Sequence, residues 1–132
     1  MNLFVDTSVW SLALRRDPPV SSPKVTLLAR SLDEGGSIFT TGLVLQELLQ
    51  GFQGPKAGSE IRSRLSALPF IVPERDDHVA AAELRNACRR DGVQVGTVDA
   101  LLAQLCIRHG LAMLTTDSDF ERVAQRTKLS LA

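Results

Sequence analysis

The sequence lacks the features that mark several common classes of protein. Its 132 residues include only two cysteines, Cys88 and Cys106, and these form no CxxC pair, so a disulfide framework is excluded. No apolar run approaches the roughly 18 residues that a membrane-spanning helix needs. The first residues carry no basic and apolar signal segment. We therefore expect a cytoplasmic protein with no membrane contact, whose two thiols stay reduced in or near the core.

Motifs of several enzyme classes are also missing. The chain has no GxxxxGK[ST] or GxGxxG loop for binding phosphates and no GxSxG nucleophile elbow. It has no histidine pair or cysteine cluster at the spacing of zinc ligands, which argues against a zinc site. Receiver and haloacid-dehalogenase-like domains also use aspartates at strand ends. They need a lysine after a late strand, however, and Lys128 follows the last expected helix.

An excess of charge of either sign is absent as well. Lysine and arginine together number 15, and so do aspartate and glutamate, which leaves a net charge of zero. This balance argues against a uniformly basic nucleic-acid binder. It does not exclude a protein in which the two signs of charge are segregated.

The pattern that the chain does have is an alternation of short apolar runs with amphipathic helical segments. At 44% hydrophobic residues, the chain is large enough to form one domain over 1–132. We expect an α/β fold whose mostly parallel four- to five-stranded sheet carries helices on both faces. The expected strands are 3–5, 37–40, 70–72, 112–115 and, at an edge, 129–131. The expected helices are 7–14, 24–34, 42–52, 57–68, 76–90, 97–109 and 118–125, with 15–23 as a loop.

Several side chains have an expected place within these helices. We expect Thr97 to be the N-cap of its helix. Trp10 is expected in the core, as are Val79 and Ala82 of the helix 76–90 and Val98 of the helix 97–109.

Acidic residues follow two of the expected strands. Asp6 comes directly after the first strand, and Asp117 follows Leu114 with two residues between them. Ligands of open α/β sheets bind outside the carboxyl ends of the strands, so both carboxylates are expected at one edge of the sheet. Asp119 adds a third carboxylate at the start of a helix.

Two further acidic residues allow either of two interpretations. Asp99 lies in the first turn of a helix, where a carboxylate also stabilises the helix dipole. Glu47 borders an apolar stripe, but a solvated position at the edge of that stripe is equally compatible with the pattern. If these carboxylates gather at one place, they need a counter-charge. Mg²⁺ suits such oxygen ligands, and the matching chemistry is phosphodiester hydrolysis.

Four sequence segments together resemble a known family. They are VDTSVW at 5–10, LQELLQG at 45–51, TVDALLA at 97–103 and LTTDSDF at 114–120. In this order, and spread over nearly the whole chain, they resemble the PIN-domain ribonucleases, and most closely the VapC-type toxins of bacterial and archaeal toxin–antitoxin pairs.

The resemblance implies roles for individual residues. It implies a catalytic quartet of Asp6, Glu47, Asp99 and Asp117. It further implies metal ligation by Asp6, Asp99, Asp117 and Asp119, with supporting hydroxyl groups on Thr7, Ser8 and Thr97. Each of these three hydroxyl residues could instead simply cap a helix. Thr115 or Thr116 is expected to play a similar supporting part.

The resemblance also implies an activity and partners. The expected activity is endonucleolytic cleavage of RNA, such as a tRNA or rRNA, dependent on Mg²⁺ with Mn²⁺ able to replace it. The expected partners are a second copy of the chain and a cognate protein antitoxin, which form a toxin–antitoxin hetero-oligomer. Operator DNA is contacted only through the antitoxin. The alternatives are a housekeeping PIN nuclease of RNA processing and a catalytically weak binding module in an antitoxin–DNA complex.

The proposed metal ligands change the meaning of the neutral net charge. If Asp6, Glu47, Asp99, Asp117 and Asp119 surround a metal, only ten acidic residues remain to balance 15 basic ones. Of these basic residues 12 are arginine, the side chain best suited to bidentate phosphate contacts. We therefore expect a concentrated acidic pocket inside a mildly basic body.

Overall fold

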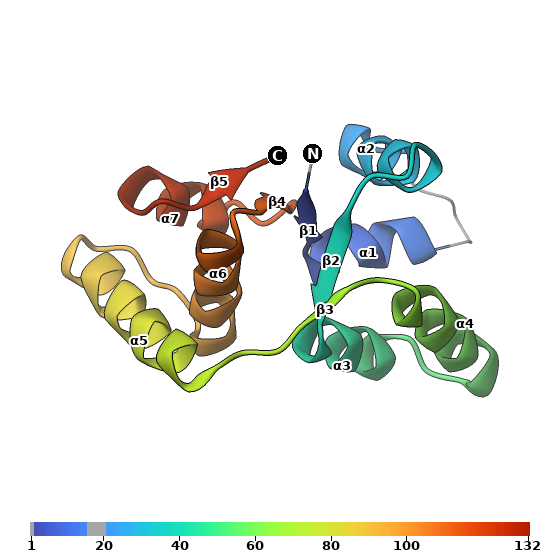
Figure 1. The fold of residues 1–132 in the computed structure, drawn as a ribbon, viewed down its shortest axis with the longest axis horizontal. Coiled ribbons are helices and arrows are strands. Elements are labelled where there is room, and N and C mark those ends of the chain that lie inside the picture. The colour runs from blue at the N-terminus through green and yellow to red at the C-terminus, as the bar shows by residue number, and fades with distance from the viewer. Residues whose placement is uncertain (1, 16–20) are drawn as a thin grey trace.

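A computed structural model describes residues 2–15 and 21–132, and its centre is a parallel β-sheet (Figure 1). The strands are β1 Leu3–Val5, β2 Ile38–Thr41, β3 Phe70–Ile71, β4 Ala112–Leu114 and β5 Ser130–Leu131. They lie in the order β3-β2-β1-β4-β5, and neighbouring strands in the described chain run parallel. The predicted parallel sheet is confirmed, and the expected edge strand is β5, which pairs with β4.

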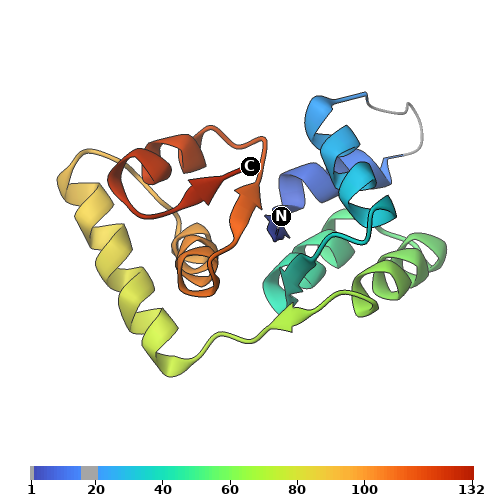
Figure 2. The same cartoon turned by 45° about the horizontal axis from the view of Figure 1, so that its top comes forward.

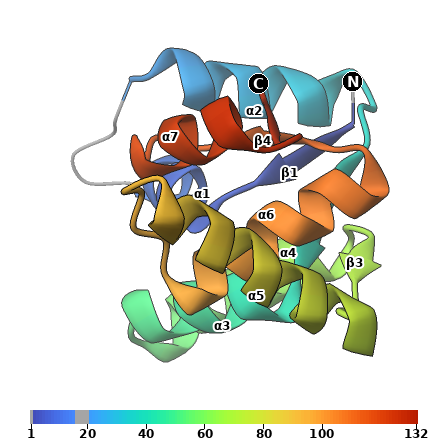
Figure 3. The same cartoon turned by 90° about the vertical axis from the view of Figure 1, so that its left-hand side faces the viewer.

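Helices lie on both sides of this sheet, as predicted. They are α1 Thr7–Leu14, α2 Pro23–Asp33, α3 Gly42–Gly51, α4 Pro55–Ser66, α5 Arg75–Arg90, α6 Thr97–His109 and α7 Asp119–Arg126. Figures 1 and 2 show α1 to α4 on one side of the strands and α5 to α7 on the other. Figure 3 shows α5 and α6 next to each other on the side facing the viewer.

The central strand β1 is buried on both faces, which explains its uninterrupted apolar sequence. Leu3, Phe4 and Val5 have no exposed surface. Side chains from both helical layers complete the core, and Trp10 is among them at 3% exposure, as expected. Cys88 and Cys106 are buried free thiols, in agreement with the sequence prediction. None of the described helices is long and apolar enough to cross a membrane.

The order of the strands determines where a ligand site can form. From β1 the chain continues outward through β2 and β3, and then returns to the other side of β1 to form β4. The direction of strand addition therefore reverses between β1 and β4. The carboxyl ends of strands at such a reversal are the usual location of a binding crevice in open α/β sheets.

Several helix boundaries differ from the prediction because of local backbone chemistry. Helices α2 and α4 begin at Pro23 and Pro55, one and two residues earlier than expected, because proline suits the first position of a helix. The prediction of Thr97 as an N-cap was wrong. Gly96 is the N-cap of α6, with extended backbone angles and a carbonyl that accepts from Ala100 N at 2.9 Å. Of the predicted loop 15–23, residues 16–20 lie outside the described residues.

Some expected core positions are exposed. Val79 is 53% exposed, Val98 is 39% exposed, and Ala82 lies on the surface of α5. A pattern of apolar residues indicates which side of a helix faces the core, but it does not indicate how much of that side is buried. Helix α5 is covered mainly along a narrow line that includes Ala81 and Cys88, so its flanking apolar residues face solvent. Val72, expected in the third strand, lies beyond the end of β3 and is 73% exposed.

Candidate active site

Asp6 is held firmly at the junction of β1 and α1. It is 7% exposed, and its backbone N–H donates to the carbonyl of Leu114 in β4 at 2.9 Å. Its own carbonyl accepts from Trp10 N at 3.2 Å in the first turn of α1. The strand pairing and the helix start thus place the Asp6 carboxylate at the carboxyl edge of the sheet.

Two hydroxyl groups fix one oxygen of this carboxylate. Ser8 Oγ and Thr115 Oγ1 each donate to Asp6 Oδ2 at 2.8 Å. Thr115 is only 4% exposed, so its hydroxyl makes this bond away from bulk water. Thr115 Oγ1 also accepts from Asp117 N at 3.0 Å, and Ser8 Oγ accepts from Thr116 N at 3.0 Å. The sequence had left Thr115 and Thr116 as alternatives, and the side chain that contacts Asp6 is Thr115.

Asp117 and Asp119 follow β4 and lead into α7. Ser118 is the N-cap of α7, but its side chain makes no capping bond. Instead Asp117 Oδ1 accepts from Asp119 N at 2.9 Å. The Asp119 carboxylate is more exposed and forms an ion pair with Arg122 at 3.2 Å. The Thr115 hydroxyl therefore connects Asp6 to the segment that carries both of these aspartates.

The pKa of Asp99 indicates that these carboxylates lie in one region of the molecule. Burial and, in decreasing order, the negative charges of Asp6, Asp117, Glu47 and Asp119 together raise the pKa of Asp99 from 3.8 to about 6. Partial burial and the charge of Asp6 also raise the pKa of Glu47. We call the five residues the acidic edge: Asp6, Glu47, Asp99, Asp117 and Asp119. The fold brings together five side chains that are up to 113 positions apart in the sequence.

The three predicted supporting hydroxyl groups occupy different surroundings. Ser8 contacts Asp6 directly. Thr7 Oγ1 is buried and has no hydrogen-bond partner among the described residues. Thr97 is exposed at the start of α6. Of the three, only Ser8 is joined to the acidic edge by a hydrogen bond within residues 2–15 and 21–132.

Lys24 is a residue that no sequence motif pointed to. Its Nζ donates to the carbonyl oxygen of Thr115, so α2 contacts the segment that follows β4. Lys24 and Thr115 are 91 positions apart. Only the tertiary structure reveals that this lysine supports the backbone next to Asp117.

The chemistry of the acidic edge fits a hard divalent cation. Its side chains offer oxygen ligands only, and their mutual repulsion is relieved by a positive charge. In the described part of the chain, no three His, Cys, Asp or Glu side chains are already arranged to hold a metal ion. Mg²⁺ uses few protein carboxylates and completes its shell with water and phosphate oxygens, so it does not require such a ready-made set.

Comparison with known proteins gives a consistent result. The PIN domain family model matches residues 3–126. The VapC ribonuclease Mb1587 of Mycobacterium bovis is 30% identical over 132 residues, covering 98% of this chain and 97% of that protein.

Two solved structures share the fold. The VapBC2 structure from Rickettsia felis, bound to a promoter DNA fragment, has a TM-score of 0.74 at 21% identity, covering all of this chain and 98% of that chain. VapC20 of Mycobacterium tuberculosis, described as a sarcin-ricin loop cleaving toxin, has a TM-score of 0.68 at 21% identity, covering 97% and 98%. Together with the family match over almost the whole chain, the order of the strands and the acidic edge lead to one conclusion: this chain belongs to the PIN domain family.

Proposed function

We propose that this protein is a metal-dependent endoribonuclease, the toxin of a VapBC-like toxin–antitoxin pair. The observation that carries the proposal is the acidic edge, where a buried, hydroxyl-anchored Asp6 lies near four other carboxylates at the reversal of strand order. A relative that is 30% identical along almost the whole chain and is named a ribonuclease supports the same activity.

The proposed cofactor is Mg²⁺, with Mn²⁺ able to replace it. Asp6, Asp99, Asp117 and Asp119 would hold the ion, which supplies an activated water and neutralises charge on the phosphate. Ser8 and Thr115 keep Asp6 Oδ2 in place before the ion arrives. Glu47 belongs to the same acidic edge, and we assign it the role of accepting a proton from the attacking water.

The proposed substrate is a structured cellular RNA, either a tRNA or an rRNA loop. The described cleavage of the sarcin-ricin loop by VapC20 supports the choice of rRNA as one candidate.

The proposed partners are a second copy of this chain and a cognate protein antitoxin, in the cytoplasm. Operator DNA would be contacted through the antitoxin, as the DNA-bound VapBC2 complex of R. felis suggests by analogy. The acidic edge favours a cationic antitoxin side chain.

Incubation of the purified protein with total cellular RNA tests this activity. With Mg²⁺ we expect discrete fragments from one or a few RNA species, and with EDTA we expect none. Expression in a bacterial host should arrest growth, and co-expression of the protein encoded next to it should restore growth. Absence of cleavage with both Mg²⁺ and Mn²⁺ would contradict the proposal. Cleavage without growth arrest would favour a nuclease of RNA processing instead.

A further inference from the structure

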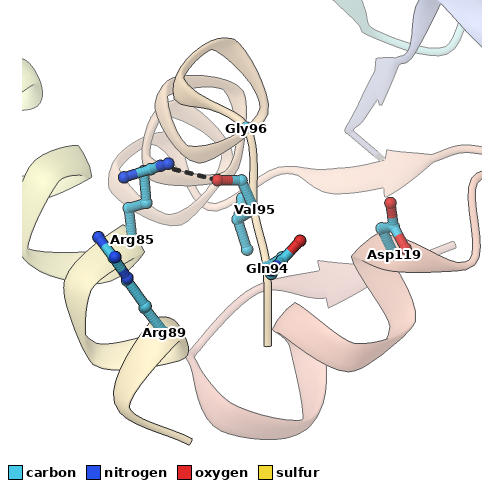
Figure 4. Close-up of a pocket in the computed structure, with 6 residues that line it drawn as sticks. All are labelled: Arg85, Arg89, Gln94, Val95, Gly96 and Asp119. Atoms are coloured by element: carbon cyan, nitrogen blue, oxygen red, sulfur yellow. Dashed lines mark hydrogen bonds between the residues drawn. The ribbon is translucent and has the colours of Figure 1, made fainter. Parts of the chain in front are cut away.

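A cavity of about 500 Å³ adjoins the acidic edge on the side of α5. Its walls come from α5, from the segment 94–96 that precedes α6, and from the start of α7 (Figure 4). The residues that line it are Arg85, Arg89, Gln94, Val95, Gly96 and Asp119. We call it the arginine cavity. Its volume lies within the range of roughly 300–1,000 Å³ that is common for ligand pockets.

The two arginines lie one helical turn apart on α5 and therefore on the same face of the helix. Arg85 is partly buried, and its Nε donates to the carbonyl oxygen of Val95 at 2.8 Å. This bond uses one of the five N–H donors of the guanidinium group. It fixes the side chain, so the terminal N–H groups are already oriented when a ligand arrives. Arg89 is exposed and adds a second guanidinium to the same cavity.

The arginine cavity shares one residue with the acidic edge and lies next to a second. Asp119 belongs to both. Gly96 lines the cavity, and a Cβ atom placed on it would lie 3.8 Å from Asp99 Oδ2. Figure 4 shows the arginines on one side of the segment 94–96 and Asp119 on the other. A polymeric ligand bound across the acidic edge therefore has to cross only the segment 94–96 to reach the two arginines.

We propose that the arginine cavity is a subsite for a phosphate of single-stranded RNA, next to the phosphate that is cleaved. This inference rests on the proposed ribonuclease function and extends it to substrate binding. Arginine binds phosphate through charge-assisted hydrogen bonds, and the fixed Arg85 loses little freedom on binding. The carboxylate of Asp119 repels the phosphate from the opposite wall, so the bound phosphate lies on the α5 side.

RNA explains this arrangement better than an acidic peptide does. A ribonuclease must hold one phosphate at the metal-binding carboxylates, and the next phosphate of the same strand follows after one ribose. A neighbouring cationic site therefore suits a polyanionic substrate. An acidic peptide needs no metal-bound anion beside the arginines, so it gives no reason for the arginine cavity to adjoin the acidic edge.

The test compares two neighbouring arginines of α5. Arg89→Gln removes a charge from the arginine cavity, whereas Arg90→Gln removes the same charge one residue away, outside the residues that line it. The probe is a fluorescently labelled 12-nucleotide RNA of mixed sequence. Its binding to the full-length protein is followed by fluorescence anisotropy in Mg²⁺ at several salt concentrations, within a time at which a gel shows the probe still intact. Cleavage of total RNA by the wild-type protein with Mg²⁺ is measured in parallel.

We expect Arg89→Gln to raise the Kd by roughly tenfold, because a charge-assisted contact is lost. The slope of log Kd against log salt should fall by about 0.7, the value for one phosphate contact on a single strand. Arg90→Gln should change the Kd less than about twofold. Equal effects of the two substitutions would overturn the subsite, and so would an unchanged Kd of Arg89→Gln. If wild-type protein fails to cleave RNA at all, the proposed function itself is contradicted.

Discussion

Thr115 joins two parts of the acidic edge through a single hydroxyl group. It donates to Asp6 Oδ2 and accepts from Asp117 N, and it is almost completely buried. Because a buried hydrogen bond of this kind has few alternative geometries, we regard Thr115 as a residue that positions Asp6. Its neighbour Thr116 is exposed and contributes only its backbone N–H to the network.

We therefore predict that Thr115→Val lowers the rate of RNA cleavage by at least about tenfold. Valine keeps the shape but removes the hydroxyl group, so Asp6 loses a donor and Asp117 N loses an acceptor. Thr115→Ser should restore most of the rate, and Thr116→Val should leave it close to that of the wild type. Initial cleavage rates of the three variants, at a fixed Mg²⁺ concentration, provide the measurement. A Thr115→Val protein as active as Thr116→Val would refute the positioning role.

The raised pKa of Asp99 predicts a pH dependence of stability. Its pKa is about 6 in the folded protein and 3.8 ordinarily, so the folded state binds this proton more tightly than the unfolded state. The corresponding stabilisation is fully present below about pH 3.8 and is lost as the pH rises through 6. In metal-free buffer near pH 7.5, Asp99→Asn should therefore be more stable than the wild type by about 1 kcal/mol, since solvent partly screens the charge.

Urea denaturation of both proteins from about pH 4 to pH 8 measures this difference. The two curves of unfolding free energy against pH should converge at the acidic end and separate through pH 6. A difference that is constant with pH would show that Asp99 does not interact with the other carboxylates.

The positions of the individual acidic residues were largely predictable from sequence. Asp6 follows an apolar strand, and the segments around Glu47, Asp99 and Asp117 resemble family motifs. The neighbours that hold them were less predictable. No local pattern indicates that Lys24 reaches Thr115, or that Thr115 rather than Thr116 faces Asp6, because these contacts depend on how distant segments pack.

At the scale of elements, a buried ion pair joins α5 to α6. Asp77, which is 1% exposed, accepts from Arg108 Nε at 2.7 Å and from Arg108 Nη2 at 2.8 Å. It also accepts from Glu74 N at 2.8 Å, which caps the start of α5. Burial by itself raises the pKa of Asp77, but these hydrogen bonds outweigh it and hold the pKa below its ordinary value. The pair fixes the helix that carries Arg85 and Arg89 against the helix that carries Asp99.

Removal of this carboxylate should loosen the two helices. We predict that Asp77→Ala lowers the free energy of unfolding by about 2–4 kcal/mol at neutral pH, because Arg108 loses a buried partner and α5 loses its cap. Asp76→Ala, in the same first turn but exposed, should cost less than about 1 kcal/mol.

The pH dependence of this effect has the opposite sign to that of Asp99. The stabilisation by Asp77 is present above its ordinary pKa of 3.8 and is lost as the pH falls through the lower value of the folded state. Urea denaturation near pH 7 and near pH 3 should therefore give a larger difference between Asp77→Ala and wild type at the first pH than at the second. Equal losses from Asp76→Ala and Asp77→Ala at neutral pH would exclude the proposed role of the ion pair.

The elements themselves were predictable in number and order, while their ends and faces were not. Helical periodicity located α5 and α6, but it could not indicate that Asp77 is buried or that Val79 and Val98 are exposed. The reason is that a helix face is buried only where another element covers it. The early starts of α2 and α4 were set by proline at the first helical position, a signal present in the sequence that the apolar pattern does not include.

At the scale of the whole molecule, the neutral net charge hides a separation of charge. Negative charge gathers at the acidic edge, and arginines of α5 line the adjoining cavity. Asp119 pairs with Arg122 at the junction between the two regions. The sequence composition predicted such a separation, but only the fold determines which arginines lie beside the carboxylates.

A cation at the acidic edge should stabilise the folded protein. At pH 7.5 we predict that millimolar Mg²⁺ raises the Tm by about 2–5 °C, because binding to the folded state alone shifts the unfolding equilibrium. Asp99→Asn should lose most of this shift. Sodium chloride at equal ionic strength is the control for general screening of charge. A Tm that responds equally to both salts would argue against a specific cation site.

The central claim, that the acidic edge cleaves RNA with a divalent metal, is tested most directly by comparing two substitutions that remove the same charge. Asp6→Asn changes a buried carboxylate of the acidic edge, whereas Asp33→Asn changes an exposed one at the end of α2. Cleavage of total RNA in Mg²⁺ is measured for both proteins after equal circular dichroism spectra show that both are folded. The account predicts at least about a hundredfold loss for Asp6→Asn and a rate within about twofold of wild type for Asp33→Asn. A folded Asp6→Asn protein that cleaves RNA at the wild-type rate would contradict the account.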